Sequence, residues 1–188
     1  MEALQQHLTR EQYLTIDEAS PDKHQFYQGE IFAMSGGSYN HSRIAMNLGT
    51  QLQTVANTSC TPMTSDMRVS TPSGLDTYPD VSVHCGEPEL TDNNCTLLNP
   101  VLIVEVLSKS TRDYDRGEKF NNYRSIPTLQ DYLMIDSERV HVEHFQRQSD
   151  TQWLLSEYSK PEDELTLNSV GLTLSLETIY QRTQFPES

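Results

Sequence analysis

The stretch Val101-Leu-Ile-Val-Glu-Val-Leu107 decides the fold, because it is apolar at every position but one. Large aliphatic and β-branched residues without alternation are typical of a strand that is covered on both faces of a sheet. The odd-numbered residues of such a strand, Glu105 among them, share one face, and the even-numbered residues share the other. We therefore expect an interior strand from which a single carboxylate projects.

Glu105 is a charged residue in the middle of this apolar strand. A buried carboxylate without a partner costs several kcal/mol, so its presence requires an explanation. One explanation is a functional site that holds a cation against Glu105. The alternative is a structural ion pair with an arginine of a later helix, such as Arg116 or Arg124.

The bulk composition describes an ordinary globular chain. The 188 residues, 35% hydrophobic and 21% charged, favour one domain spanning residues 1–188. No apolar run approaches the roughly 20 residues that cross a membrane, and the N-terminus lacks the pattern of a signal peptide. The three cysteines, Cys60, Cys85 and Cys95, are odd in number and lack CxxC spacing. This count predicts neither a disulfide framework nor a zinc site, and it favours a cytoplasmic location.

The net charge of −14, from 27 acidic and 13 basic residues, bears directly on function. Nucleic-acid-binding proteins are usually basic, because contacts with phosphates supply most of their affinity. A DNA-binding face on this chain would therefore be a local basic patch, or binding would be bridged by a metal or weak.

Periodicity and turn residues predict the order of the elements. A capping box formed by Thr9 and Gln12 starts the first helix. Helices are expected at residues 8–19, 40–56, 113–125 and 176–182, and strands at 24–34 (with a turn at Gly29), 60–70, 78–85, 101–107, 130–136, 139–147, 152–158 and 171–174. Residues 60–70 and 78–85 would form an antiparallel hairpin, and 86–99 a surface loop. The helix between strands 101–107 and 130–136 indicates a parallel crossover, and hence an α/β fold with a mixed sheet flanked by helices.

Three residues could combine into a site for phosphate chemistry. Asp80 follows a proline in a predicted strand, Glu105 lies in the central strand, and Lys119 lies on the helix after it. Two carboxylates from neighbouring strands suit a hard cation such as Mg²⁺, which takes few protein ligands. A lysine beside the cation can position a nucleophile and offset charge in the transition state.

The runs Tyr78-Pro-Asp80, Val104-Glu105-Val-Leu-Ser108 and Tyr114-Asp-Arg-Gly-Glu-Lys119 resemble those of the PD-(D/E)xK nuclease superfamily, and of its "putative restriction endonuclease" branch in particular. The likeness extends upstream to residues 29–36 and His41. It implies a restriction-endonuclease-like domain in which Asp80 and Glu105 ligate Mg²⁺ or Mn²⁺. It also implies that Asp80, Glu105 and Lys119 are the catalytic residues.

The chain departs from that pattern at two positions. The lysine of the superfamily normally lies two residues after the glutamate, where this chain has Leu107. Lys119 fits the role from the following helix, and Lys109, which shares the strand parity of Glu105, is its rival. Relatives commonly carry an acidic residue before the Gly-Glu turn, where this chain has Gln25.

Several other polar residues have both a functional and a structural interpretation. His41 is either a member of the site or a cap or core histidine, and Asp66 is either an outer acid of the site or a solvated strand residue. Candidates for phosphate contacts are Arg43, Arg112, Arg116 and Arg124, although such residues are usually plain surface charges.

The sequence thus predicts a magnesium-dependent endonuclease that hydrolyses DNA and that acts as a homodimer by analogy with restriction-type relatives. The alternative is a catalytically inactive nuclease fold that serves as a binding or assembly module. The missing ExK lysine, Gln25 and the acidic net charge favour this alternative.

Overall fold

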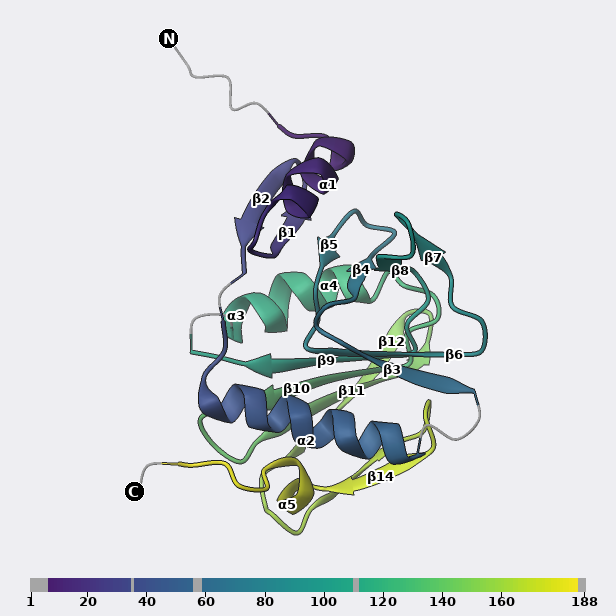
Figure 1. Ribbon diagram of the computed structural model, residues 1–188. Coiled ribbons are helices and arrows are strands. Elements are labelled where there is room, and N and C mark those ends of the chain that lie inside the picture. The colour runs from purple at the N-terminus through teal and green to yellow at the C-terminus, as the bar shows by residue number, and fades with distance from the viewer. Residues whose placement is uncertain (1–6, 35, 56–58, 110–111, 186–188) are drawn as a thin grey trace.

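The central strand predicted around Glu105 is β9 (Leu102–Leu107), and it lies inside a six-stranded sheet (Figure 1). The computed structural model describes residues 7–34, 36–55, 59–109 and 112–185. All six residues of β9 are buried. Leu102, Val104 and Val106 join one hydrophobic core, whereas Ile103 and Leu107 join a second core on the opposite face. The predicted division of the strand into two buried faces is therefore confirmed.

The sheet that contains β9 mixes parallel and antiparallel pairs. Its strands, in spatial order, are β12 (Gln152–Tyr158), β11 (Val142–Ser149), β10 (Asp131–Asp136), β9, β6 (Val81–Cys85) and β3 (Cys60–Thr64). β9 and β10 are parallel, with Glu105 opposite Met134, and every other pair is antiparallel. The chain crosses from β9 to β10 through α3 (Arg112–Tyr114), the π-helical turn η1 (Asp115–Lys119) and α4 (Phe120–Tyr123). The predicted parallel crossover is confirmed, and the predicted helix at 113–125 corresponds to these three segments.

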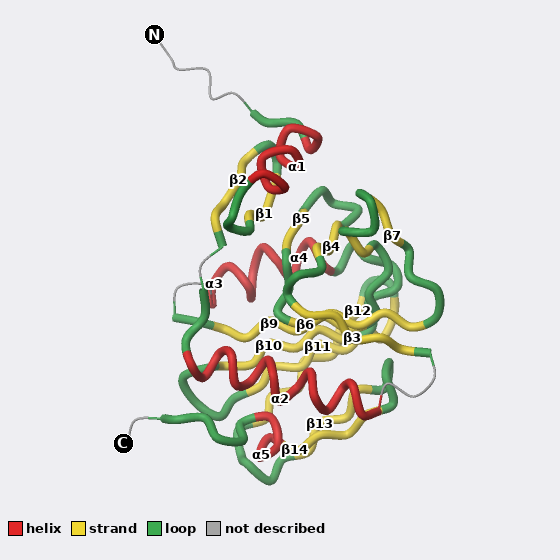
Figure 2. Tube along the Cα trace, in the orientation of Figure 1, coloured by secondary structure: helices red, strands yellow, loops and turns green. Residues whose placement is uncertain are grey.

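Helices cover both faces of this sheet (Figures 1 and 2). On one face lie α2 (Tyr39–Val55), the short helix α5 (Leu176–Ile179) and the hairpin of β13 (Glu164–Leu167) with β14 (Leu172–Ser175). The apolar spacing of α2 buries Ile44, Leu48 and Leu52 against the even-numbered residues of β9. The crossover helices lie on the other face. Among the described residues, no helix combines the length and the apolar character that crossing a membrane requires.

A second six-stranded sheet lies beyond the crossover helices. Its order is β2 (Glu30–Ala33), β1 (His24–Tyr27), β5 (Asp76–Thr77), β4 (Arg68–Ser70), β8 (Thr96–Leu97) and β7 (Leu90–Thr91). The hairpin β1–β2 and α1 (Arg10–Ala19) form a lobe at one end of the molecule (Figure 1). The capping box of Thr9 and Gln12 starts α1, as predicted. Tyr13 of α1 stacks on Phe26 of β1, with ring centroids 5.0 Å apart.

The prediction of one hairpin from residues 60–70 and 78–85 is only partly correct. β3 does pair antiparallel with β6, with Cys60 opposite Cys85. However, the chain turns after Thr64, and β4 pairs with β5 and β8 in the second sheet. Residues 86–99, predicted as a loop, contribute β7 and β8 to that sheet, and β13 was not predicted. The second sheet joins β1 to β5 and β4 to β8, which are segments far apart in sequence that no local pattern pairs.

The cysteine prediction is wrong, because Cys60 and Cys85 form a disulfide. The antiparallel register sets the two residues directly opposite each other, and their Cα atoms lie 3.9 Å apart. Cys95 is free and exposed. The odd cysteine count therefore gave no information about the pairing, and it no longer supports a reducing compartment.

Candidate active site

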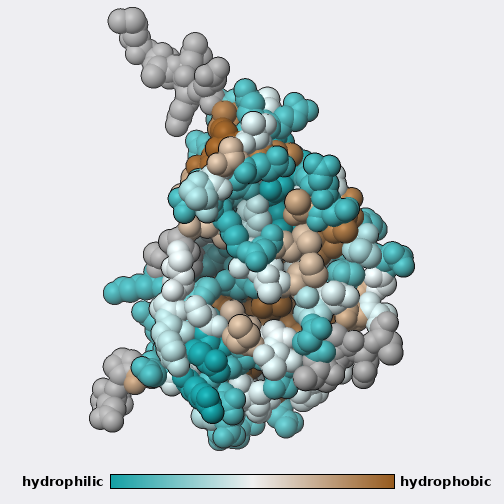
Figure 3. Space-filling model, in the orientation of Figure 1, coloured by the Kyte–Doolittle hydropathy of each residue, from teal (hydrophilic) through white to brown (hydrophobic). Residues whose placement is uncertain are grey.

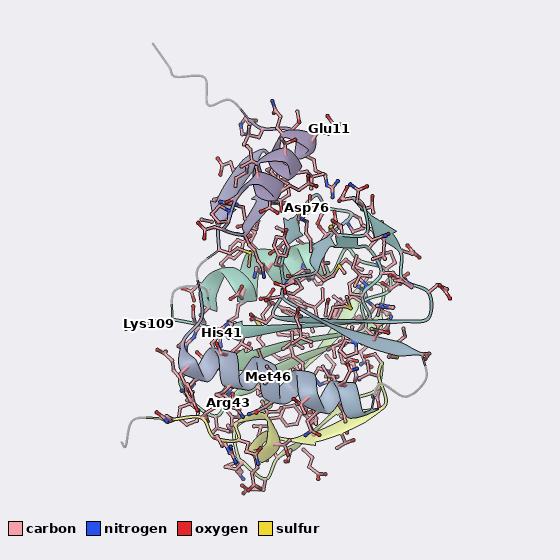
Figure 4. The ribbon with its side chains drawn as sticks, in the orientation of Figure 1. Glu11, His41, Arg43, Met46, Asp76 and Lys109 are labelled. Atoms are coloured by element: carbon pink, nitrogen blue, oxygen red, sulfur yellow. A yellow bond between two sulfur atoms is a disulfide. The ribbon has the colours of Figure 1, made fainter. Side chains whose placement is uncertain are left out.

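The structure brings the three predicted site residues to one small pocket, between the N-terminal lobe and the carboxyl end of β9. The pocket has a volume of about 150 Å³ and contains Asp80, Glu105 and Lys119 in its wall. The other polar residues of its lining are His41, Asp115, Gln25, Tyr78 and Tyr114. Figure 4 shows His41 at the N-terminal end of α2, beside the end of β9 from which the crossover helices begin.

Glu105 is buried and has two partners on the crossover helices. Nζ of Lys119 donates to its Oε1 over 3.0 Å, and the hydroxyl of Tyr123 donates to the same oxygen over 2.7 Å. Burial raises the pKa of Glu105 to about 8; the positive charge of Lys119 opposes this effect, and nearby carboxylates add to it. Burial therefore disfavours the charged form of Glu105, and a positive charge beside it favours that form.

Lys119 reaches Glu105 from the π-helical turn rather than from the strand. Its side chain is only 7% exposed, and Nζ also lies 3.1 Å from Oδ1 of Asp115, four residues earlier. Burial alone would lower the pKa of Lys119, but the charges of Glu105 and Asp115 outweigh burial and raise it. Lys119 is therefore an ammonium at neutral pH, held between two carboxylates.

Asp80 lies one residue before β6, not inside the strand as predicted. The backbone N–H of Val106 donates to its Oδ2 over 2.7 Å, which ties Asp80 to β9 next to Glu105. Nε2 of His41 lies 3.2 Å from Oδ1 of Asp80. Burial disfavours a charged imidazole, but the hydrogen bond with Asp80 and the surrounding carboxylates outweigh it and raise the pKa of His41. His41 is thus a member of the site, which was the first of its two interpretations.

Gln25 and Tyr114 close the pocket on the side of the N-terminal lobe. Gln25 lies on β1 and accepts a hydrogen bond from the hydroxyl of Thr77 over 3.3 Å. It also bonds with Tyr114, whose pKa burial raises to about 12 despite the opposing charge of Lys119. Gln25, at the position where the resemblance implied an acidic residue, therefore does face the site, but its side chain is a neutral amide.

The structure does not bring the remaining candidates into the pocket. Lys109 is exposed and is not part of the lining. Asp66 is exposed and pairs with Lys23. The four arginines considered for phosphate contacts have partners within the chain: Arg43 bonds Asn47, Arg112 bonds Asp136 and Glu138, Arg116 bonds Glu143, and Arg124 bonds Asn121 and lies over the ring of Phe120.

Two further residues belong to the site without having been predicted as members, Asp115 and Tyr123. Asp115 could have been found, because it lies four residues before Lys119 and so shares its face of a helix. Tyr123 depends on the packing of α4 against β9, for which the sequence carries no local pattern.

The lining of the pocket fits a hard divalent cation. Three carboxylates line it together with one ammonium and one imidazole, so negative charge is in excess. Oδ1 of Asp115 is buried, and it meets Nζ of Lys119 at 3.1 Å as an ion pair without the angles of a regular hydrogen bond. Carboxylate oxygens are the ligands that Mg²⁺ and Mn²⁺ prefer.

A second group with possible ligand atoms lies elsewhere, on β11 and β12. It consists of His141, Glu143 and Glu157, whose ligand atoms lie within 4.8 Å of one another. Glu143 is already paired with Arg116. This group is distinct from the pocket around Glu105.

Comparison with known proteins agrees with the fold and with the motifs. The chain belongs to the Uma2 family, described as "Putative restriction endonuclease", whose model matches residues 10–177. It is 38% identical over 180 residues to the uncharacterized protein slr1290 of Synechocystis sp., covering 95% of this chain and 94% of that one. It is 43% identical over 153 residues to a second uncharacterized protein of that organism, sll1609, covering 80% of this chain and 86% of that one.

A solved structure shares the architecture. It is a "putative nuclease belonging to DUF820" from Anabaena variabilis, and it superposes with a TM-score of 0.77 at 17% identity. The match covers 92% of this chain and 97% of the other. The restriction-endonuclease-like α/β fold expected from the sequence is thereby confirmed.

Proposed function

We propose that this protein is a metal-dependent nuclease that hydrolyses phosphodiester bonds in DNA. The observation that carries the proposal is the convergence of Asp80, Glu105 and Lys119 on one pocket of a nuclease fold. Two carboxylates and an ammonium are the groups that this chemistry requires.

Asp80 and Glu105 would hold Mg²⁺ or Mn²⁺, with Asp115 available as a further oxygen ligand. When bound, the cation would polarise the phosphate and offset the negative charge that develops on it. The backbone N–H of Val106 fixes one oxygen of Asp80, and Tyr123 fixes one oxygen of Glu105, so both carboxylates are oriented in advance. Lys119 would place a positive charge beside the attacked phosphate.

The direct test is nicking of supercoiled plasmid DNA in the presence of Mg²⁺ or Mn²⁺. Wild-type protein should nick, and Glu105→Gln and Asp80→Asn should lose activity while keeping the circular dichroism spectrum of the fold. Calorimetric titration with Mn²⁺ should show binding that both substitutions abolish. Equal activity in wild type and Glu105→Gln would remove the assignment.

One observation favours the inactive binding module as a second candidate function. Lys119 and Tyr123 both bond the same oxygen of Glu105, so this carboxylate is satisfied without a metal. If the protein is such a module, neither the wild type nor the variants should show a heat of Mn²⁺ binding, and none of them should nick the plasmid. The calorimetric titration therefore separates the two functions.

A homodimer remains our expectation from the analogy with restriction-type nucleases. Sedimentation equilibrium of the purified protein tests it directly: a mass near 21.5 kDa would contradict it.

A further inference from the structure

A groove lined by aromatic rings adjoins the pocket that holds Glu105. It has a volume of about 490 Å³ and shares Gln25 and Tyr114 with that pocket. Figure 3 shows the surface hollowed between the N-terminal lobe and the body of the molecule. The groove is therefore continuous with the site where Asp80 and Glu105 meet.

One wall of the groove is the outer face of the hairpin β1–β2. Gln25 lies opposite Phe32 in the register of the two strands, and Tyr27 lies two residues from Gln25, so all three side chains share this face. The other face carries Phe26, which stacks on Tyr13 of α1. Because α1 already covers that inner face, the hairpin does not need Phe32 for its packing, and Phe32 is 43% exposed.

The opposite wall comes from the crossover helices, with Tyr114 and Glu118. The aromatic rings of Tyr27, Phe32 and Tyr114 thus line one cavity, together with the imidazole of His7. Glu30 and Glu118 add carboxylates at its edges. Flat apolar rings suit a flat aromatic ligand, and carboxylates accept hydrogen bonds from amino groups such as those on nucleobases.

Charge decides which part of a nucleic acid this groove could hold. A phosphate backbone would be repelled by Glu30 and Glu118, and the net charge of the chain is −14. The four arginines considered for phosphate contacts each bond an acidic or amide side chain of this chain. Stacking on aromatic rings, by contrast, can hold a nucleobase without a row of basic side chains. It requires a base that is not already stacked on its neighbours in the nucleic acid.

We propose that the groove of Tyr27, Phe32 and Tyr114 binds an unstacked nucleobase next to the scissile phosphate, so that the substrate is single-stranded or locally unpaired DNA. This inference rests on the proposed nuclease function and names the substrate class of the same site. The phosphate would lie at Glu105 and Lys119, and the adjoining base would enter between the rings. A fully paired duplex keeps its bases stacked inside and would not fill the groove.

Binding can be measured separately from hydrolysis. The probe is a single-stranded oligonucleotide with one 2-aminopurine, whose fluorescence falls when the base stacks. It is titrated with Glu105→Gln protein in EDTA, and the same strand annealed to its complement is titrated in parallel. We expect quenching with the single strand, and at least about tenfold weaker binding of the duplex.

Substitutions at Phe32 separate stacking from general packing. Phe32→Leu keeps an apolar side chain but removes the ring, and it should weaken binding by about tenfold, the effect of losing one stacking partner. Phe32→Trp should retain binding. Leu154→Ala is the matched control, because Leu154 is 52% exposed on the edge strand β12 and should not affect binding.

Equal affinity for single strand and duplex, or unchanged affinity in Phe32→Leu, would overturn the proposal. These outcomes do not depend on nuclease activity. If neither the plasmid nor single-stranded DNA is cleaved while quenching is observed and Phe32→Leu weakens it, the groove stands as a binding site and only the hydrolytic function falls. If duplex and single-stranded DNA are cleaved equally well, the nuclease function stands and the groove proposal falls.

Discussion

The ring of His41 lies directly against Gly37, so closely that a Cβ added to Gly37 would be 2.4 Å from Nδ1 of His41. The other ring nitrogen, Nε2, is the one beside Asp80. The absence of a side chain at residue 37 is therefore what allows the imidazole to lie between α2 and the carboxylate of Asp80.

We predict that Gly37→Ala turns His41 away from Asp80 and disturbs the orientation of that carboxylate. Cleavage should fall on the order of tenfold to a hundredfold, as expected when a reacting group is displaced. Because residue 37 is exposed, the free energy of unfolding should change little. Gly36→Ala is the matched control, since a Cβ there meets no atom within 4 Å. Equal loss of activity in both variants would show that the His41 contact is not responsible.

Replacement of Lys119 by Met should remove the only ammonium in the lining of the pocket described above. Glu105 and Asp115 would then repel each other without compensation, and the protein should lose about 3 kcal/mol of stability together with its activity. Lys109→Met should leave both properties unchanged, because Lys109 is exposed and outside the pocket. Urea denaturation and the nicking assay measure the two effects. Activity lost in Lys109→Met but kept in Lys119→Met would reverse the assignment.

The N-terminal lobe should loosen in acid because of Asp17. Burial acts against ionisation of this carboxyl, but the hydroxyl of Tyr78, the backbone N–H of His24 and the charge of Arg68 lower its pKa below 3.8. A depressed carboxyl pKa stabilises the fold above the ordinary pKa and ceases to do so as pH falls through the folded pKa. Asp17→Asn should therefore cost about 3 kcal/mol at neutral pH, and the difference from wild type should shrink below about pH 4. Urea denaturation of both proteins across this range measures it, and a constant difference would contradict the prediction.

Reduction of the disulfide between Cys60 and Cys85 should lower stability. The bond closes a loop across 25 positions, for which the loss of chain entropy in the unfolded state corresponds to about 3 kcal/mol. Cys60→Ser should show this loss under oxidising conditions, and Cys95→Ser, at an exposed free thiol, should not. Thiol titration of the unfolded, unreduced protein should find Cys95 alone reactive. Three reactive thiols before reduction would show that the bond does not form.

Local patterns were enough to predict the elements around the site. The apolar run at 101–107 identified β9, and its parity placed Glu105 on the face of Lys119 and Tyr123. A charge inside an apolar strand requires a partner, and Glu105 has its partners in the pocket. The family motifs then supplied Asp80 and Lys119.

The parts that were not predicted depend on contacts between distant segments. Residues 60–70 looked like one strand, because nothing local shows that β3 and β4 pair in different sheets. The disulfide depends on the register of β3 against β6. The choice between Lys119 and Lys109 depended on how the crossover helices pack on β9, and the structure places only Lys119 in the pocket.

The wide turn of η1 has a consequence for the evolution of the site. A π-helical turn holds one residue more than an α-helical turn, so it shifts the angular phase of everything that follows. Deleting Gly117, the exposed residue in its middle, would rotate Lys119 by about 100° about the helix axis and carry its ammonium away from the sheet. A lineage could therefore remove the ammonium from this site by losing a single codon, while its architecture and all its carboxylates persisted.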